Sequence, residues 1–459
     1  MMKNSLSRRS GLILLCLCLP VAALAEGLSE FTLKNGLKIV VKEDHRAPTV
    51  AHMVWYRAGS MDEFNGTTGV AHVLEHMMFK GTKTLKPGEF SDRVAALGGQ
   101  ENAFTTQDYT AYYQQIHKSH LAKVMALEAD RMHNLVIAPD EFAREMKVVM
   151  EERRWRTDDR AQSRLYETFM ATAYQAHPYR VPTIGWMRDL ETLTARDAQQ
   201  WYQTWYTPAN ATLVVAGDVD PQQVLHLAQR YYGNIPSHPL PARRPQDEPA
   251  QAGQKRVEVK APAENPYLLI GFKVPRLQNI EQDVEPYALE VLSGVLDGYP
   301  GARLNTALVR QQRSADQAGA GYDLLGRGPA LFLLDGSPAA GKTTAALETA
   351  LRAEVAKIAS AGITEAELAR VKTQLIASQV YKRDSIFGQA MEIGSYEMSG
   401  IGARNIDHVL GKLKAVTAQQ VQAVAQKYFG DDAMTVAVLL PQPLDPNKVS
   451  APPKGLHHQ

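Results

Sequence analysis

The sequence has almost no cysteine. Among its 459 residues, only Cys16 and Cys18 are cysteines, and both lie near the N-terminus. If this segment is removed on export, the mature chain has no thiol, which excludes a disulfide, a thiolate-bound metal ion and a cysteine nucleophile. Any metal ion must then be held by histidine and carboxylate side chains.

The sequence also lacks an excess of charge of either sign. It contains 50 Lys and Arg residues against 49 Asp and Glu residues, which gives a net charge of +1. Without Lys3, Arg8 and Arg9 the balance is 47 against 49, a net charge of −2. No basic stripe marks a surface for nucleic acid, so nucleic acid is not expected as a partner.

The apolar run at residues 12–19 is too short to span a bilayer. It follows the three basic residues named above and precedes Ala23, Leu24 and Ala25, which form an A-x-A cleavage site. We therefore expect residues 1–25 to be a signal peptide. The general secretion route is favoured over the twin-arginine route, because Gly11 stands where a bulky apolar residue is usual. This pattern predicts a bacterial protein of the periplasm or a secreted one, with no membrane span after signal removal.

Residues 68–79 (TGVAHVLEHMMF) contain the pattern H-x-x-E-H, formed by His72, Glu75 and His76. In a helix, residues four apart lie on one face about 6 Å apart along the axis, so both imidazoles can reach one metal ion. Glu75 lies on the same side and can hold a metal-bound water without being a ligand. This inverzincin pattern is typical of zinc peptidases and predicts one zinc ion per chain.

A motif this short also occurs by chance, and the alternative is an amphipathic helix whose histidines are satisfied at the edge of a core. The flanking residues Val73, Leu74, Met77, Met78 and Phe79 make the other faces of the helix apolar, which indicates burial. Buried histidine and glutamate side chains need polar partners, and a metal ion supplies them. The flanking residues therefore favour the metal site.

Two histidines leave a zinc ion one protein ligand short. Residues 139–156 have a helical pattern that contains Glu145, Glu151 and Glu152. Glu145 and Glu152 are two helical turns apart and share a face, which favours Glu152 over Glu151 as the third ligand. The alternative is a helix with a solvated acidic face, and spacing alone does not decide between the two.

Residues 102–113 predict one or two strands rich in threonine and tyrosine. Beside a metal helix, such a strand could be an exposed sheet edge that pairs with an extended peptide substrate. Asn102, Ala103 and Phe104 are then the candidate substrate-binding residues. An ordinary sheet strand explains the same residues equally well.

A proline-rich segment separates two similar parts of the chain. Residues 235–249 contain five prolines and no apolar periodicity, which predicts an extended linker. Residues 197–215 and 420–438 overlay at a constant offset of 223 residues, so we expect two domains of one fold. The expected organisation is a zinc-binding domain, a linker, a homologous domain without a metal site and a tail, at residues 26–235, 236–255, 256–445 and 446–459.

A second motif points to a different chemistry. The pattern G-x-x-x-x-G-K-[ST] of phosphate-binding loops begins at Gly336 and ends at Thr343, between an apolar strand and a helix. No run of βαβ units surrounds it, and no apolar strand ends in a clear magnesium-binding aspartate. An exported protein also meets little ATP. We therefore do not expect nucleotide binding despite the match.

Several of these motifs together resemble the pitrilysin (insulinase-like) zinc metallopeptidases, most closely the short-chain branch with mitochondrial processing peptidase and its bacterial relatives. The resemblance is carried by residues 72–76, 102–105, 148–152, 206–210 and 214–218. It implies an α/β (α+β) fold with two homologous domains, each a mainly antiparallel sheet packed with helices, that enclose a chamber.

The resemblance also implies roles for individual residues. The zinc ligands are carried over to His72, His76 and Glu152, the general base to Glu75 and a supporting acidic residue to Glu145. The separation of 76 residues between His76 and Glu152 matches that of the family.

Active members of the family have an arginine and, seven residues later, a tyrosine that bind the substrate. Here the corresponding residues are Arg310 and Gln317, so the tyrosine is missing. We therefore expect a zinc-dependent endopeptidase subunit that acts on peptides or unfolded polypeptides. Its partner is a homologous zinc-less subunit that supplies the Arg/Tyr pair in a heterodimer, or a second copy in a homodimer. The alternative is a non-catalytic peptide-binding or scaffold subunit of the same fold.

Overall fold

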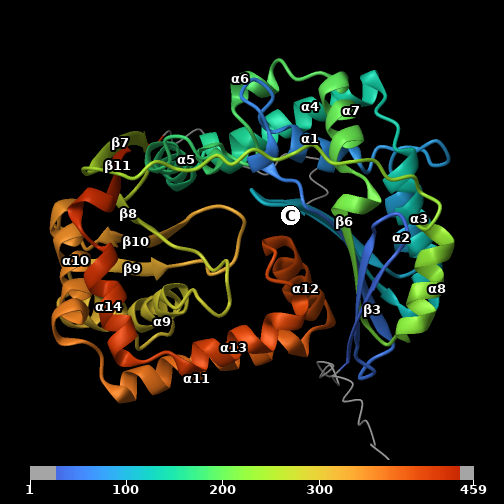
Figure 1. Cartoon of the computed structure of the whole chain (residues 1–459). Coiled ribbons are helices and arrows are strands. Elements are labelled where there is room, and N and C mark those ends of the chain that lie inside the picture. Colours follow the sequence, from blue (N-terminus) through green and yellow to red (C-terminus); the bar gives the residue numbers. More distant parts are fainter. Residues whose placement is uncertain (1–26, 445–459) are drawn as a thin grey trace, which may run out of the picture.

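The computed structural model describes residues 27–444. The predicted signal peptide and the predicted tail lie outside the described residues. The chain forms two sheets packed with helices, side by side (Figure 1). No helix among residues 27–444 is long and apolar enough to cross a bilayer.

The first sheet has the strand order β1-β2-β6-β3-β5-β4. Neighbouring strands are antiparallel except for β2 and β6, which are parallel. Strand β4 therefore lies at an edge of the sheet. The strands are β1 (Leu28–Thr32), β2 (Lys38–Glu43), β3 (Thr49–Tyr56), β4 (Gln100–Thr105), β5 (Thr110–His117) and β6 (Ala211–Gly217).

The second sheet has the order β7-β11-β8-β10-β9, and only β7 and β11 are parallel. This order repeats β2-β6-β3-β5-β4 of the first sheet strand for strand, so the repeat predicted from the sequence is confirmed as two domains of one topology. The strands are β7 (Lys255–Pro262), β8 (Tyr267–Val274), β9 (Ala315–Gly321), β10 (Ala330–Pro338) and β11 (Met434–Gln442).

Helices cover the outer face of each sheet (Figure 1). On the first sheet these are α1 (Val70–Met77), α3 (Leu121–Asn134), α4 (Pro139–Arg153), α7 (Ala195–Trp205) and α8 (Pro221–Tyr231). On the second sheet they are α9 (Glu285–Asp297), α10 (Thr344–Ala361), α13 (Ile406–Ala415) and α14 (Ala418–Tyr428). The other α-helices are α2 (Glu89–Ala96), α5 (Ala161–Ala173), α6 (Met187–Leu190), α11 (Glu365–Asp384) and α12 (Ile386–Ser399).

The inner face of each sheet is covered by a helix from the other half of the chain. Helix α12 packs on β3 and β6, and α5 packs on β7, β8 and β11. Both contacts depend on a glycine. A Cβ atom on Gly394 of α12 would lie 2.0 Å from the ring of Trp55, and one on Gly271 of β8 would lie 2.4 Å from the ring of Phe169. This exchange of helices holds the two halves together.

We expect Gly394→Ala to destabilise the protein, because the added methyl group overlaps the buried ring of Trp55. Overpacking of this kind costs about 1–3 kcal/mol in the free energy of unfolding. Gly411→Ala in α13 is the matched control, since nothing lies within 4 Å of its Cβ position. That change should be neutral or slightly stabilising. Urea unfolding measures both variants, and equal effects would contradict this packing account.

The predicted linker has no helix or strand over residues 236–254, because β7 begins at Lys255, but it is attached to both halves. The carboxylate of Glu248 accepts hydrogen bonds from the backbone N–H groups of Gln175, Ala176 and His177 at 2.9–3.0 Å. It also accepts one from Lys273 of the second sheet at 2.6 Å. Glu248 of the linker thus connects residues 175–177 of the first half with β8 of the second sheet, at the junction of the two halves.

Stability at this junction should depend on pH through His177. Burial lowers the pKa of its imidazole to about 4, although the carboxylates of Glu248 and Asp108 oppose the shift. An unfolded histidine titrates near pH 6.5, so between about pH 6.5 and 4 the unfolded chain binds more protons than the folded one. This contribution to stability is present above pH 6.5 and is lost as the pH falls toward 4.

Urea unfolding from pH 7.5 to 4.5 tests this dependence. The wild type should lose more stability over that interval than His177→Gln, and the exposed His226→Gln variant should behave like the wild type. Parallel pH profiles for the wild type and His177→Gln would show that His177 does not contribute.

The motif that resembles a phosphate-binding loop has a different structure here. Its first residues, Gly336 to Pro338, belong to β10, whose neighbours β8 and β9 are both antiparallel to it. A phosphate-binding loop instead follows a parallel strand of a βαβ unit. Gly336 has a packing role, because a Cβ there would lie 2.3 Å from the carbonyl oxygen of Gln317.

Candidate metal centre

Helix α1 is short, and all eight of its residues are buried. It begins after Gly69, whose φ of 88° favours glycine, and a Cβ at this position would lie 2.6 Å from the carbonyl oxygen of Ile184. The buried carboxylate of Glu63 accepts hydrogen bonds from the N–H groups of Gly69 (2.8 Å) and Ala71 (2.9 Å). These contacts satisfy the N-terminus of α1 and fix its position.

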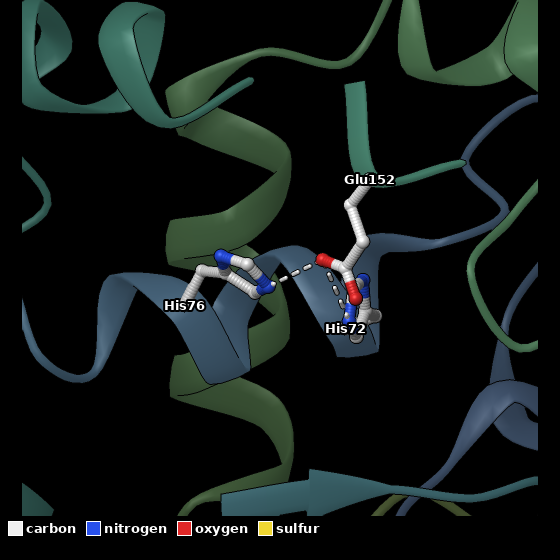
Figure 2. Close-up of side chains that lie close together, drawn as sticks. All are labelled: His72, His76 and Glu152. Atoms are coloured by element: carbon white, nitrogen blue, oxygen red, sulfur yellow. Dashed lines mark ion pairs between the residues drawn. The ribbon is translucent and has the colours of Figure 1, made fainter. Parts of the chain in front are cut away.

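Three side chains from two helices converge beside α1. Figure 2 shows His72 and His76 on α1 and Glu152 reaching toward them from α4. The Nε2 atoms of His76 and His72 lie 3.2 Å and 3.8 Å from Oε2 of Glu152. One potential ligand atom from each residue lies within 4.8 Å of the others, and all three residues are buried.

The donor set fits a zinc ion. Two imidazole nitrogens and one carboxylate oxygen are the ligands of many catalytic zinc sites, which keep a fourth position open for water or substrate. Oε2 of Glu152 is buried and makes no hydrogen bond of good geometry with any residue in the range 27–444. A buried carboxylate oxygen in that state is costly unless a cation binds it.

The electrostatics favour the metal-binding forms of two of the three residues, His72 and Glu152. Burial lowers the pKa of His72 to about 3, so its imidazole is neutral. Burial would raise the pKa of Glu152, but His76, His72 and Arg156 outweigh burial and lower it to about 2. Glu152 is therefore ionised, as a metal ligand must be. For His76, burial would lower the pKa, but the carboxylates of Glu145 and Glu152 outweigh burial and raise it to about 9, so its imidazole must lose a proton to bind a metal ion.

A carboxylate and two cations support the ligands. Oε1 of Glu145 lies 2.9 Å from Nδ1 of His76, and Lys80 pairs with Oε2 of Glu145 at 2.7 Å. A carboxylate on Nδ1 fixes the ring so that Nε2 faces the metal position. Arg156 pairs with Oε1 of Glu152 at 3.0 Å. The sequence predicted Glu145 but not Lys80 or Arg156, although each follows a candidate ligand by four residues.

Glu75 lies next to the three candidate ligands without joining them. It is 2% exposed, and burial raises the pKa of its carboxyl group to about 7. Its Oε2 atom accepts a hydrogen bond from the hydroxyl group of Thr105, at the end of β4. Glu151, the rejected alternative to Glu152, is exposed and pairs with Arg154.

The candidate centre opens into a cavity of about 820 Å³ between the two halves of the chain. The first half contributes His72 and residues 105–107, and the second sheet contributes Tyr267, Leu269, Leu333 and Asp335. A larger cavity of about 1510 Å³ lies under the linker, but none of the three candidate ligands lines it. The smaller cavity is therefore the one that gives access to the candidate metal centre.

The candidate substrate-binding residues lie on β4; they are Asn102, Ala103 and Phe104. Strand β4 is an edge strand, which the alternative of an exposed peptide-binding edge requires. These three residues do not line the 820 Å³ cavity. Thr105 is the residue of β4 that does. Phe104 instead packs edge-on against Trp55, with ring centroids 5.6 Å apart. Their role in substrate binding stays a prediction.

Arg310 and Gln317, the residues expected at the positions of the family's Arg/Tyr pair, are both exposed. Arg310 lies in a π-helical segment, Asn305–Gln311, and donates a hydrogen bond to the carbonyl oxygen of Pro300 at 3.1 Å. Gln317 lies on β9. Neither residue lines the cavity that contains His72.

Known proteins resemble this chain over most of its length. Residues 38–185 match the family model "Insulinase (Peptidase family M16)", and residues 192–375 match "Peptidase M16 inactive domain". The "Zinc protease PqqE" of Helicobacter pylori is 33% identical over 89% of this chain and 92% of its own length. The "Uncharacterized zinc protease YmxG" of Bacillus subtilis is 26% identical over 88% of this chain and 96% of its own length.

Solved structures agree with these sequence matches. The crystal structure of a protease from Helicobacter pylori has a TM-score of 0.85 at 31% identity and covers 90% of this chain and 99% of its own. The first half of the periplasmic protease PqqL from Escherichia coli has a TM-score of 0.77 at 20% identity, over 92% of this chain and 94% of its own, and shows the same fold. The sequence matches and the fold agree, and this chain belongs to the insulinase-like peptidase family M16.

Proposed function

We propose that this protein is a zinc-dependent endopeptidase subunit that hydrolyses peptides or unfolded polypeptides. The observation that carries the proposal is the convergence of His72, His76 and Glu152 within 4.8 Å, beside a buried Glu75 and at the wall of a large cavity. A zinc ion bound there supplies a Lewis acid that polarises the scissile carbonyl group and makes water a nucleophile at neutral pH.

The side chains of this chain would transfer the proton, orient a ligand and bind the substrate. Glu75 would accept the proton of the attacking water and pass it to the leaving amine nitrogen. Burial favours the protonated form of the Glu75 carboxyl group and so raises its pKa, which helps this group to hold the proton before it passes it on. Glu145 would hold the ring of His76. An extended substrate would pair with the edge of β4 at residues 102–104 and enter the cavity beside Thr105.

We also propose that the chain needs a second subunit for full activity. A homologous zinc-less chain would supply the Arg/Tyr pair in a heterodimer, with a homodimer as the other arrangement. Two observations support this: Gln317 stands where the family has tyrosine, and neither Gln317 nor Arg310 lines the cavity of the candidate centre.

The purified chain alone should contain zinc yet cleave peptides only weakly, because it lacks part of its substrate-binding machinery. A pull-down for a homologous chain, followed by an assay of the pair on a library of quenched fluorescent peptides, tests this expectation. The pair should be at least about 10²-fold more active than the chain alone, since positioning groups contribute effects of that size. Strong endopeptidase activity from the isolated monomer would contradict the need for a partner.

The proposed location is the periplasm or the outside of the cell. The N-terminal sequence pattern supports it, and the solved relative from Escherichia coli is described as a periplasmic protease. Fractionation of cells that produce the tagged chain tests this proposal, and a full-length product in the cytoplasm would contradict it.

A further inference from the structure

We propose that Thr105 is a positioning residue for Glu75, so that the edge strand β4 sets the orientation of the general base. The inference rests on the proposed peptidase function and adds a residue to it. Thr105 is outside the H-x-x-E-H motif and 30 residues from Glu75 in the chain.

The contact between the two residues is direct. The hydroxyl group of Thr105 donates a hydrogen bond to Oε2 of Glu75. It is the one side-chain hydrogen bond that Glu75 makes within the part of the chain that the structure describes. A hydroxyl group has a single proton, so this bond occupies the donor of Thr105 and one lone pair of Oε2. Oε1 accepts no side-chain hydrogen bond from the described residues, which makes it the better placed oxygen to receive a proton from water.

Thr105 is itself held in place by the sheet. It pairs with Thr110 across β4 and β5, and the two Oγ1 atoms lie 3.4 Å apart. Thr110 is fully buried and donates a hydrogen bond to the carbonyl oxygen of Ala58 at 3.0 Å. The hydroxyl group that holds Glu75 therefore stands on a rigid element, as the orientation of a catalytic group requires.

The hydrogen bond also keeps Glu75 in its role as a base. Glu75 lies one residue from His76, and a carboxylate without a tether beside a bound divalent cation can turn and become a further ligand. That rotation would fill the open position on which a catalytic zinc site depends. The bond from Thr105 opposes the rotation, because the buried Oε2 atom would lose its donor.

The same strand links the base to the substrate. Residues 105–107 line the cavity, and β4 is an edge strand, the kind of element that can pair with an extended peptide. A peptide paired with β4 would lie beside the strand that ends in Thr105. The substrate and the residue that orients the base would thus share one element.

Two variants separate the hydroxyl group from the shape of the side chain. Thr105→Val keeps the shape and removes the donor, whereas Thr105→Ser keeps the donor. Thr349→Val is the matched control, because Thr349 is exposed on α10, outside the lining of this cavity, and its hydroxyl group donates to the carbonyl oxygen of Ala345. Each protein is loaded with zinc, and its zinc content and thermal unfolding are measured before any other comparison.

The first readout needs no turnover. The probe is a dipeptide hydroxamate, which chelates zinc and presents a polar group to the base. We expect Thr105→Val to bind it about tenfold more weakly than the wild type at equal zinc content, while Thr105→Ser and Thr349→Val bind it normally. The second readout is hydrolysis of a quenched peptide: kcat of Thr105→Val should fall about 10–100-fold, part of the 10²–10⁴-fold supplied by a general base, with KM unchanged.

The outcomes distinguish this inference from the proposed function. If Thr105→Val hydrolyses peptides and binds the hydroxamate within twofold of the wild type, the positioning role is wrong and the peptidase function stands. If Thr105→Ser fails as badly as Thr105→Val, the hydroxyl group is not the reason, and the inference is again wrong. A zinc-loaded wild type that neither binds the hydroxamate nor cleaves peptides, with or without a partner, would overturn the peptidase function and this inference together.

Discussion

Replacing Glu75 by glutamine should abolish nearly all peptide hydrolysis while the protein keeps its zinc. Glutamine has the shape of glutamate and can still accept the hydrogen bond from Thr105, but its amide cannot take a proton from water. Because Glu75 is not among the three converging side chains, its loss should leave the metal site intact. We expect kcat/KM to fall about 10²–10⁴-fold, the range that general-base catalysis supplies.

The zinc content and kcat/KM of the purified variant check this expectation. Glu151→Gln is the matched control, since Glu151 is exposed on the helix that carries Glu152 and pairs with Arg154. That variant should behave like the wild type. If Glu75→Gln lost zinc as completely as a variant of a candidate ligand, Glu75 would be a ligand and not the base.

Replacing His72 by alanine should remove the metal ion itself, and hydrolysis with it. Alanine offers no ligand atom, and one histidine with one glutamate leaves too few ligands to hold zinc against a chelator. We expect Glu145→Gln to have a smaller effect, about a 10–100-fold loss of zinc affinity, because Glu145 acts on the ligand His76 through a hydrogen bond. Competition with a chromophoric chelator measures both affinities.

The exposed His133 on α3 supplies the control for a lost imidazole, and His133→Ala should keep its zinc. Circular dichroism and thermal unfolding of the metal-free proteins check that His72→Ala is folded. A folded His72→Ala protein that binds zinc as tightly as the wild type would contradict the proposed ligand set.

Much of the fold could be predicted from the sequence, because its signals are local or repeated. The helix expected within residues 68–79 is α1, the helical pattern of residues 139–156 is α4, and the strands predicted over residues 102–113 belong to β4 and β5. The offset of 223 residues matches α7 and β6 to α14 and β11, which occupy equivalent places. The exchange of α5 and α12 between the sheets could not be predicted, because it depends on contacts such as Gly394 on Trp55.

Part of the candidate site could likewise be predicted from the sequence, and part of it could not. His72, Glu75 and His76 follow from one helical turn, and Glu152 follows from its spacing to Glu145 together with the family resemblance. Lys80 and Arg156 could have been found, because each lies one turn after a candidate ligand. The contact of Thr105 with Glu75 could not, because it joins a strand end to a helix through the packing of β4 against α1.

The direct test of the central claim is X-ray diffraction from crystals of the zinc-loaded chain, with data collected on both sides of the zinc absorption edge. The account predicts one strong anomalous peak per chain, bound by Nε2 of His72, Nε2 of His76 and the carboxylate of Glu152, with Glu75 outside the ligand set. A fully loaded crystal with no peak between these three side chains, or with its zinc on other residues, would contradict it.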